Sequence, residues 1–220
     1  MSGLGRLRQK SGDQKKGGPF GEGRMKGYQG LLALLALGLC AATGGALLGS
    51  DPAALDCERL TRYTARVSFL FFLPVFTLSA LSHFVRHPAV LALRPRRRQL
   101  GITFGIAHLC HFGAILLLHR HQGSWFTAED SAALFIYALL GVQVATSNTP
   151  AARALGKFWR PTHWVASYAL FVGFFTTYLE RLQESGELVY LLLFVLASAA
   201  WALRVAAFFA KRRPGPLSAT

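Results

Sequence analysis

The sequence predicts an all-α protein, a polytopic bundle of helices that crosses a lipid bilayer. Two observations predict this fold class. Hydrophobic residues make up 52% of the 220 residues, and they fall in long blocks instead of the short periodic patches typical of a soluble domain. Arginine and lysine gather in every second segment between these blocks, which is the distribution expected of cytoplasmic loops.

Six blocks are predicted as membrane spans because their length and composition suit the hydrocarbon core of a bilayer. They are residues 30–49, 66–85, 100–118, 132–147, 161–179 and 188–210, of which the fourth is the shortest. The first block follows a basic segment, as in a signal peptide, but it is longer than a usual signal-peptide core. We therefore expect it to be retained, giving a six-helix transmembrane domain over 28–213.

The segments outside this domain are predicted as cytoplasmic tails. Residues 1–27 are rich in Gly, Lys, Arg and Ser and nearly free of apolar side chains, a composition that favours disorder. Residues 214–220 form a second short tail. Neither tail approaches the roughly one hundred residues that a flavin or nicotinamide domain needs, so such cofactors would have to come from a partner chain.

The net charge of +14 and the pI near 10.6 would suggest nucleic-acid binding in a soluble protein. Here the positive charge lies before the first block, before the third and fifth blocks, and after the sixth. This pattern places both termini in the cytoplasm and the protein in a membrane, which we expect to be a bacterial inner membrane. We therefore expect the positive charge to set the orientation of the protein in the membrane and to attract anionic lipids, and we expect no nucleic-acid partner.

The fourth and fifth blocks are predicted to be joined by a short helix at about 150–155. Thr149 and Pro150 suit its first positions, and Gly156 suits its end. Arg160 and Pro161 then begin the next helix in the same way. His163 is therefore expected in the first turn of the fifth span, near the cytoplasmic surface.

Three histidines of the third and fifth predicted spans are the main candidates: His108, His111 and His163. An imidazole in hydrocarbon is costly unless it is bound, which makes it a functional candidate, and haem iron is a frequent occupant of such sites. His108 and His111 share one helix face because they are three residues apart. The alternative is a structural role, in which these side chains only make hydrogen bonds between helices.

Other polar residues border the spans. His83, His87, His119 and His121 are expected at the interfaces, where water solvates them. Arg98 and Arg160 stand at the cytoplasmic ends of the third and fifth spans and could pair with haem propionates; the alternative is that they only set orientation. The three cysteines, Cys40, Cys57 and Cys110, do not form a disulfide framework.

Several short motifs occur in a recognisable order. They are TARVSFLFFLPVFTLSAL at 64–81, RRRQLGITFGIAHLCHF at 96–112, TSN at 146–148 and LGKFWRPTHW at 155–164. Over about residues 60–180 the chain resembles the ferric reductase-like transmembrane domain. That superfamily includes the haem-binding membrane subunit of bacterial methionine sulfoxide reductase and the membrane halves of NADPH oxidases.

The resemblance implies a four-helix core of the second to fifth spans that holds b-type haem. By motif position, His111 or His108 matches the ligand on the third span and His163 the first ligand on the fifth. Family members commonly carry a second histidine about thirteen residues on, where this chain has Thr176. The resemblance therefore implies one haem. Electrons would come from a cytoplasmic flavin or NAD(P)H reductase, or from quinol, and pass to an acceptor at the outer face.

Three functions follow as hypotheses. The first is a membrane cytochrome of the b type that passes electrons through one haem held by His163 with His108 or His111. The second is a haem-free scaffold or assembly subunit in which the histidines join helices. A histidine-lined transporter is disfavoured because no acidic residue lies within a predicted span, and proton or metal relays usually include one.

Overall fold

The computed structural model describes residues 56–124 and 126–212, together with residues 30, 32, 34–39 and 41 of an earlier helix. The predicted tails at 1–27 and 214–220 lie outside the described residues, as does most of the predicted span 30–49. The described part is helical and contains no strand, so the all-α prediction is confirmed.

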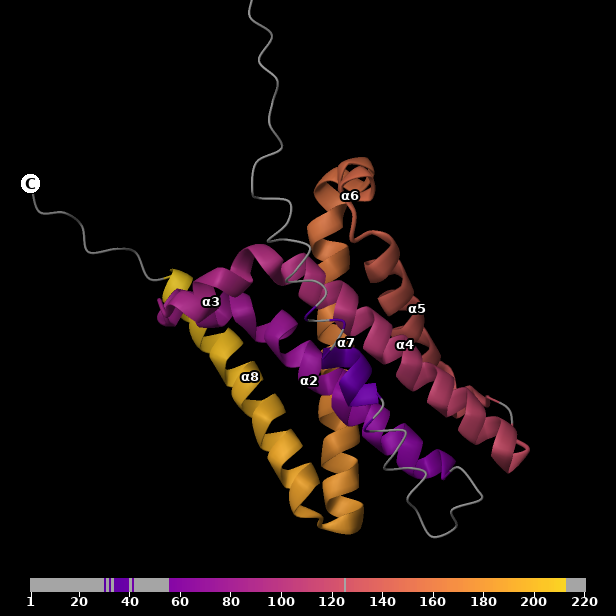
Figure 1. Ribbon diagram of the computed structural model, residues 1–220. Coiled ribbons are helices and arrows are strands. Elements are labelled where there is room, and N and C mark those ends of the chain that lie inside the picture. Colours follow the sequence, from indigo (N-terminus) through magenta and orange to yellow (C-terminus); the bar gives the residue numbers. More distant parts are fainter. Residues whose placement is uncertain are drawn as a thin grey trace, which may run out of the picture.

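Seven helices follow one another along the continuous part of the chain (Figure 1). They are α2 (Cys57–Phe84), α3 (Pro88–Leu93), α4 (Arg97–Gln122), α5 (Ser131–Ala145), α6 (Thr149–Leu155), α7 (Trp159–Ser185) and α8 (Leu188–Arg212). Short 3-10 turns, η1 (Arg94–Arg96), η2 (Ala128–Asp130) and η3 (Gly156–Phe158), precede α4, α5 and α7. Each of the last five predicted spans thus matches one helix, although α2 ends one residue and α5 two residues before the predicted bounds. Helices α2, α4, α7 and α8 extend past their predicted bounds at one or both ends by two or more residues.

Local capping explains where several of these helices begin and end. The Asp56 side chain accepts a hydrogen bond from the backbone N–H of Arg59 at 2.9 Å and so caps α2. Gly123 and Gly186 end α4 and α7 in the left-handed conformation, which glycine adopts readily. The cap of α6 is Asn148 and not the expected Thr149, because the Asn148 side chain accepts from the N–H of Ala151 at 2.8 Å.

The longest helices pack around α2. It contacts α4 along one side and α8 along another, while α7 packs against α8 and α5. Figure 1 shows α4 and α5 on the side of α2 away from α8. Aromatic rings fill the interior between α2, α4 and α7; they include Phe69, Phe72, Phe76, Phe104, Phe171, Phe174 and Tyr178.

Three helical segments of the described chain are long and apolar enough to cross a membrane. They are Cys57–Phe84, Pro88–Gln122 and Leu188–Arg212. Helix α5 with Thr149–Ser185 passes the same test only as a pair bent by 109°, which would make a fourth. The structure therefore supports three to four candidate spans, and the count of six stays a prediction.

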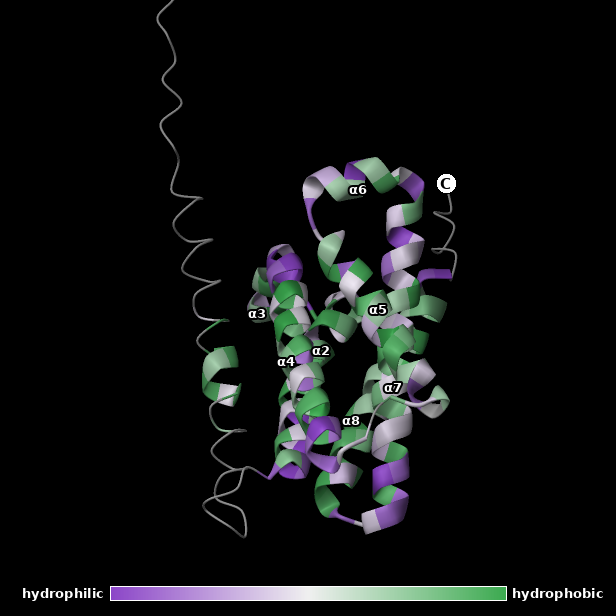
Figure 2. Ribbon diagram, turned by 90° about the vertical axis from the view of Figure 1, so that its right-hand side faces the viewer, coloured by the Kyte–Doolittle hydropathy of each residue, from purple (hydrophilic) through white to green (hydrophobic). Residues whose placement is uncertain are grey.

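The surface of the bundle suits lipid. Large apolar side chains point outward, among them Leu188, Phe135 and Trp164, which are 68%, 61% and 57% exposed. Figure 2 shows hydrophobic residues along the middle of the bundle and hydrophilic residues near the ends of α4 and α7. Exposed apolar area of this extent marks contact with a membrane or with partner proteins, and together with the span lengths it indicates a bilayer.

Candidate functional site: histidines between helices

His108 lies in the middle of α4 and is buried, with 7% of its surface exposed. Its Nδ1 is 2.6 Å from the hydroxyl oxygen of Ser68 on α2. Ser68 is fully buried, and its hydroxyl reaches His108 from the neighbouring antiparallel helix. This contact joins the two helices through a hydrogen bond in an environment that excludes water.

His111 makes the same kind of contact one turn further along α4. Its Nδ1 lies 3.1 Å from the hydroxyl oxygen of Thr64, which also lies 2.8 Å from the carbonyl oxygen of Leu60. A hydroxyl has one proton, and an oxygen pair this close repels unless the proton lies between them. Thr64 therefore donates to Leu60 and accepts from His111, which assigns the proton of the neutral imidazole to Nδ1 and the lone pair to Nε2.

Aromatic rings enclose the His108 imidazole. Tyr137 of α5 stacks on it with centroids 4.9 Å apart, and Phe174 of α7 meets it edge-on at 5.2 Å. Phe104 lies on a third side at 5.5 Å. The imidazole is thus packed like a core side chain, with its polar edge toward Ser68.

His163 belongs to a separate group of polar contacts at the corner between α5 and α7. Its Nε2 lies 2.9 Å from the Thr146 hydroxyl oxygen, which donates to the carbonyl of Val142 at 2.7 Å. By the same one-proton argument His163 donates from Nε2, so its tautomer is opposite to that of His111. The Trp159 ring covers the imidazole at 4.4 Å, and its indole N–H donates to the Thr146 carbonyl at 3.0 Å.

Gln143 of α5 strengthens this corner. Its amide nitrogen donates to the Ser167 hydroxyl at 2.9 Å and to the His163 carbonyl at 3.3 Å. Together with Thr146, Gln143 ties the end of α5 to the first turns of α7. These contacts hold the sharp bend between α5 and α7. His163 is the fifth residue of α7, just past the predicted first turn.

The structure does not bring His163 together with His108 or His111. The α7 residue that contacts His108 is Phe174, about three helical turns, or roughly 16 Å, beyond His163 along the axis. His111 lies about one turn beyond His108 along α4, and so still further from His163. Among the described residues there is no group of three or more His, Cys, Asp or Glu side chains that could hold a metal ion.

The space expected for a porphyrin is filled by protein. A Cβ added at Gly105 would lie 2.6 Å from Cγ2 of Val144, so the close approach that this glycine permits is made by α5. The interior beyond it holds the aromatic cluster of Phe72, Phe104 and Phe174, whose rings lie 5.2 to 6.5 Å apart. In this arrangement the residues do not fit a haem held between His163 and a histidine of α4.

The remaining site residues lie at helix ends. Arg98 and Arg160 are exposed and form no ion pair within the described ranges. Thr176, at the position where the family commonly has a histidine, is exposed and donates to the Val172 carbonyl of its own helix at 3.0 Å. A side chain at that position faces away from the interior.

The four outer histidines lie near helix ends, as expected. His83 and His121 are exposed, and the His87 side chain caps α3 by accepting from the Ala89 N–H at 3.3 Å. His119 is half-buried, with its Nδ1 2.9 Å from the Ser124 hydroxyl oxygen.

A capping box stands beside His119, outside the spans. The backbone N–H of Thr127 donates to the Asp130 carboxylate at 2.7 Å. This hydrogen bond, with smaller contributions from the Thr127 hydroxyl and from His119, holds the pKa of Asp130 below its usual value.

The hydroxyl partners of the histidines, Thr64, Ser68 and Thr146, were not predicted from the sequence. One signal was available, since Thr64 and Ser68 are four residues apart and form a polar stripe on an otherwise apolar helix. Such a stripe predicts a polar neighbour. Thr146 gives no such signal, because it lies at the end of α5.

Comparison of the chain with protein-family models, with curated proteins and with solved structures gives no match. The resemblance to the ferric reductase-like domain accordingly stays a prediction based on the quoted motifs.

Proposed function

We propose that this chain is a haem-free integral membrane scaffold or assembly subunit, in which His108, His111 and His163 join its helices. The observation that supports this function is that His108 and His111 each contact a hydroxyl on α2 and His163 contacts the hydroxyl of the residue that caps α5, at 2.6 to 3.1 Å. The proposal includes six spans with both termini in the cytoplasm, and a ferric reductase-like arrangement of α2, α4, α5 and α7.

Hydrogen bonds suit this role because helices in a bilayer gain little from the hydrophobic effect when they associate. Each interhelical hydrogen bond contributes about 0.6 kcal/mol on average and up to about 1.7 kcal/mol. Two of them fix the register of α4 on α2, and the third fixes α7 on α5. A bundle with a fixed register presents a constant outer surface, as a subunit that organises partner chains requires.

A second candidate is the one-haem electron carrier, and one specific observation favours it. His111 donates from Nδ1 to Thr64, which leaves on Nε2 the lone pair that a metal would need. Histidines that bind metals commonly use their other nitrogen in this way. In this candidate the donor is a cytoplasmic flavin or NAD(P)H reductase or a quinol, and the acceptor is at the outer face.

A single measurement distinguishes the two candidate functions. The full-length protein is expressed with ample haem precursor and purified in detergent, and its absorption spectrum is recorded oxidised and reduced. A b-type cytochrome from the same cells provides the positive control. The scaffold predicts no Soret band, whereas a stoichiometric Soret band that His163→Ala abolishes would establish the electron carrier.

A further inference from the structure

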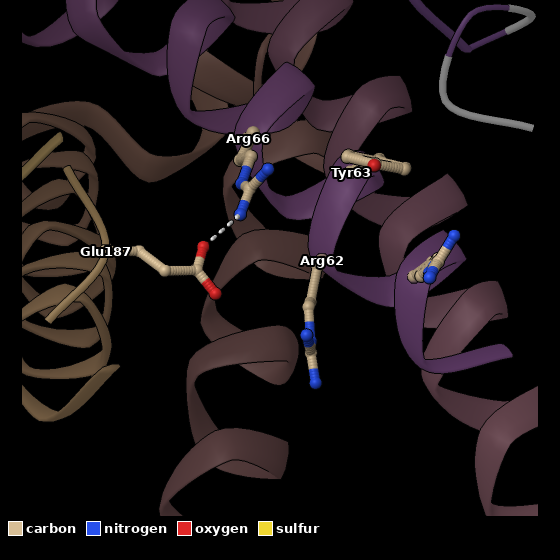
Figure 3. Close-up of a pocket in the computed structure, with 5 residues that line it drawn as sticks. Arg62, Tyr63, Arg66 and Glu187 are labelled. Carbon is tan, nitrogen blue, oxygen red and sulfur yellow. Dashed lines mark ion pairs between the residues drawn. The ribbon is translucent and has the colours of Figure 1, made fainter. Parts of the chain in front are cut away.

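A cavity of about 330 Å³ lies at the end of the bundle where α2 begins and α8 starts. It is lined by Arg59, Arg62, Tyr63, Arg66 and Glu187. The four residues of α2 lie on one helix face because their spacing follows the helical repeat. Figure 3 shows Arg62, Tyr63 and Arg66 projecting from α2, and Glu187 facing Arg66. Three guanidinium groups thus surround a space that contains one carboxylate.

Arg66 is the deepest of these groups, and its hydrogen-bonding capacity is not filled. Its side chain is 22% exposed, and its nearest approach to Glu187 is 3.9 Å, which is longer than a hydrogen bond. Its Nε is buried and has no partner among the residues that the structure describes. The guanidinium is held between the rings of Tyr63 and Tyr190, 5.4 and 5.1 Å from their centroids. These contacts fix its position but leave its Nε–H without a hydrogen-bond acceptor.

A second polar atom without a partner lies close by. The hydroxyl of Tyr178 on α7 is buried and finds no hydrogen bond in the described part of the chain. It is near enough to Arg66 to interact with it electrostatically. Buried polar atoms are almost always satisfied by protein or by a bound molecule. Arg66 lines the cavity and has an unsatisfied donor, which points to a ligand that accepts hydrogen bonds.

Arg59 and Arg62 keep donors available for such a ligand. Arg59 pairs with Asp56 and Arg62 with Glu58, each at 3.0 Å, and both carboxylates belong to residues that do not line the cavity. Exposed ion pairs of this kind are weak, and a guanidinium has five N–H donors in a planar fork. Each arginine can therefore keep its carboxylate and still bind an oxyanion.

We propose that this cavity is a binding site for a phosphate group. Arginine forks match the oxygens of phosphate in pairs, and three of them around one space favour a group with several oxygens and more than one negative charge. The phosphate belongs either to an anionic phospholipid at the membrane surface or to a free phosphate-bearing molecule. The first source suits the position of the cavity, because the predicted span of α2 begins at Arg66.

The test uses the full-length protein in detergent and measures binding by native mass spectrometry and by the shift in unfolding temperature. The lipid probes are phosphatidylglycerol and diacylglycerol, which differ by the phosphoglycerol head. The free probe is inorganic phosphate, compared with chloride at equal ionic strength. The variants are Arg62→Gln and Arg66→Gln. The matched control is Arg181→Gln, which removes an exposed arginine paired with Glu184 at 3.0 Å but outside the cavity.

Phosphatidylglycerol is expected to bind and stabilise the protein while diacylglycerol does not. Arg62→Gln weakens the affinity about tenfold, as loss of one charge-assisted contact does, and Arg181→Gln leaves it unchanged. If inorganic phosphate binds and Arg62→Gln, but not Arg181→Gln, weakens its affinity, the natural ligand is a free phosphate-bearing molecule. If Arg66→Gln fails to fold, Arg62→Gln decides the test alone. The proposal is overturned if Arg62→Gln and Arg181→Gln change the affinity equally. It is also overturned if neither phosphatidylglycerol nor inorganic phosphate binds.

Discussion

The Ser68 hydroxyl oxygen lies 2.6 Å from Nδ1 of His108, and both residues are buried between α2 and α4. One turn away, the Thr64 hydroxyl oxygen lies 3.1 Å from Nδ1 of His111. Two hydroxyls four residues apart on one helix therefore match two imidazoles three residues apart on its antiparallel neighbour. This ladder fixes how far one helix is displaced along the other.

Substitution of Ser68 by alanine tests the ladder. Ser68→Ala leaves the buried Nδ1 of His108 without a partner, and we expect it to lower the free energy of unfolding by about 1 to 2 kcal/mol. The measurement is unfolding of the purified protein in mixed detergent micelles. Ser198→Ala is the control, because the Ser198 hydroxyl donates to the Phe194 carbonyl of its own helix. Equal losses in both variants would show that the interhelical contact contributes nothing.

Two glycines of α4 provide a matched pair that tests the packing of α5. Gly105→Ala places a Cβ 2.6 Å from Val144 Cγ2, whereas a Cβ at Gly101 meets nothing within 4 Å. We expect Gly105→Ala to lower the free energy of unfolding by about 1 to 3 kcal/mol. Gly101→Ala should be neutral or raise it by up to about 1 kcal/mol.

The double variant Gly105→Ala with Val144→Ala controls this experiment. It should recover part of the loss in the same unfolding assay, since the crowding side chain is smaller. A Gly105→Ala protein as stable as Gly101→Ala would mean that α5 does not approach α4 at this position.

The corner at His163 is tested by hydrogen exchange. Thr146→Val removes the oxygen that accepts from His163, and we expect amides over residues 149–158 to exchange about tenfold faster because the corner opens more often. Thr162→Val is the control, since the Thr162 hydroxyl donates only to the Phe158 carbonyl of its own helix. Unchanged exchange in Thr146→Val would contradict a structural role for the His163 contact.

The helices could be predicted well from the sequence because an apolar block of span length suits few structures other than a membrane helix. The relative depth of the histidines could not. The motif positions implied that His163 shares one haem with His108 or His111, whereas the structure places Phe174 opposite His108. Depth depends on how α4 and α7 pack through other helices, and that information lies in contacts distant in sequence.

The polar contacts of the site were harder to predict than its histidines. The Thr64 and Ser68 stripe could have indicated a polar partner, but the sequence does not tell which helix supplies it. Asn148 and Thr149 can both cap a helix, and the cap geometry decides between them. The sequence likewise does not tell which neighbour approaches Gly105, and in the structure it is Val144 of α5.

The central claim, that the histidines between the helices bind hydroxyls and not iron, is tested most directly by nitrogen-15 NMR. The seven histidines are labelled, and His111 and His163 are assigned by substitution to glutamine, before and after one equivalent of haemin is added. We predict a protonated Nδ1 in His111, a protonated Nε2 in His163, and signals that haemin leaves unchanged. Joint loss of the His111 and His163 signals on addition of haemin, as paramagnetic iron binds both rings, would contradict the account.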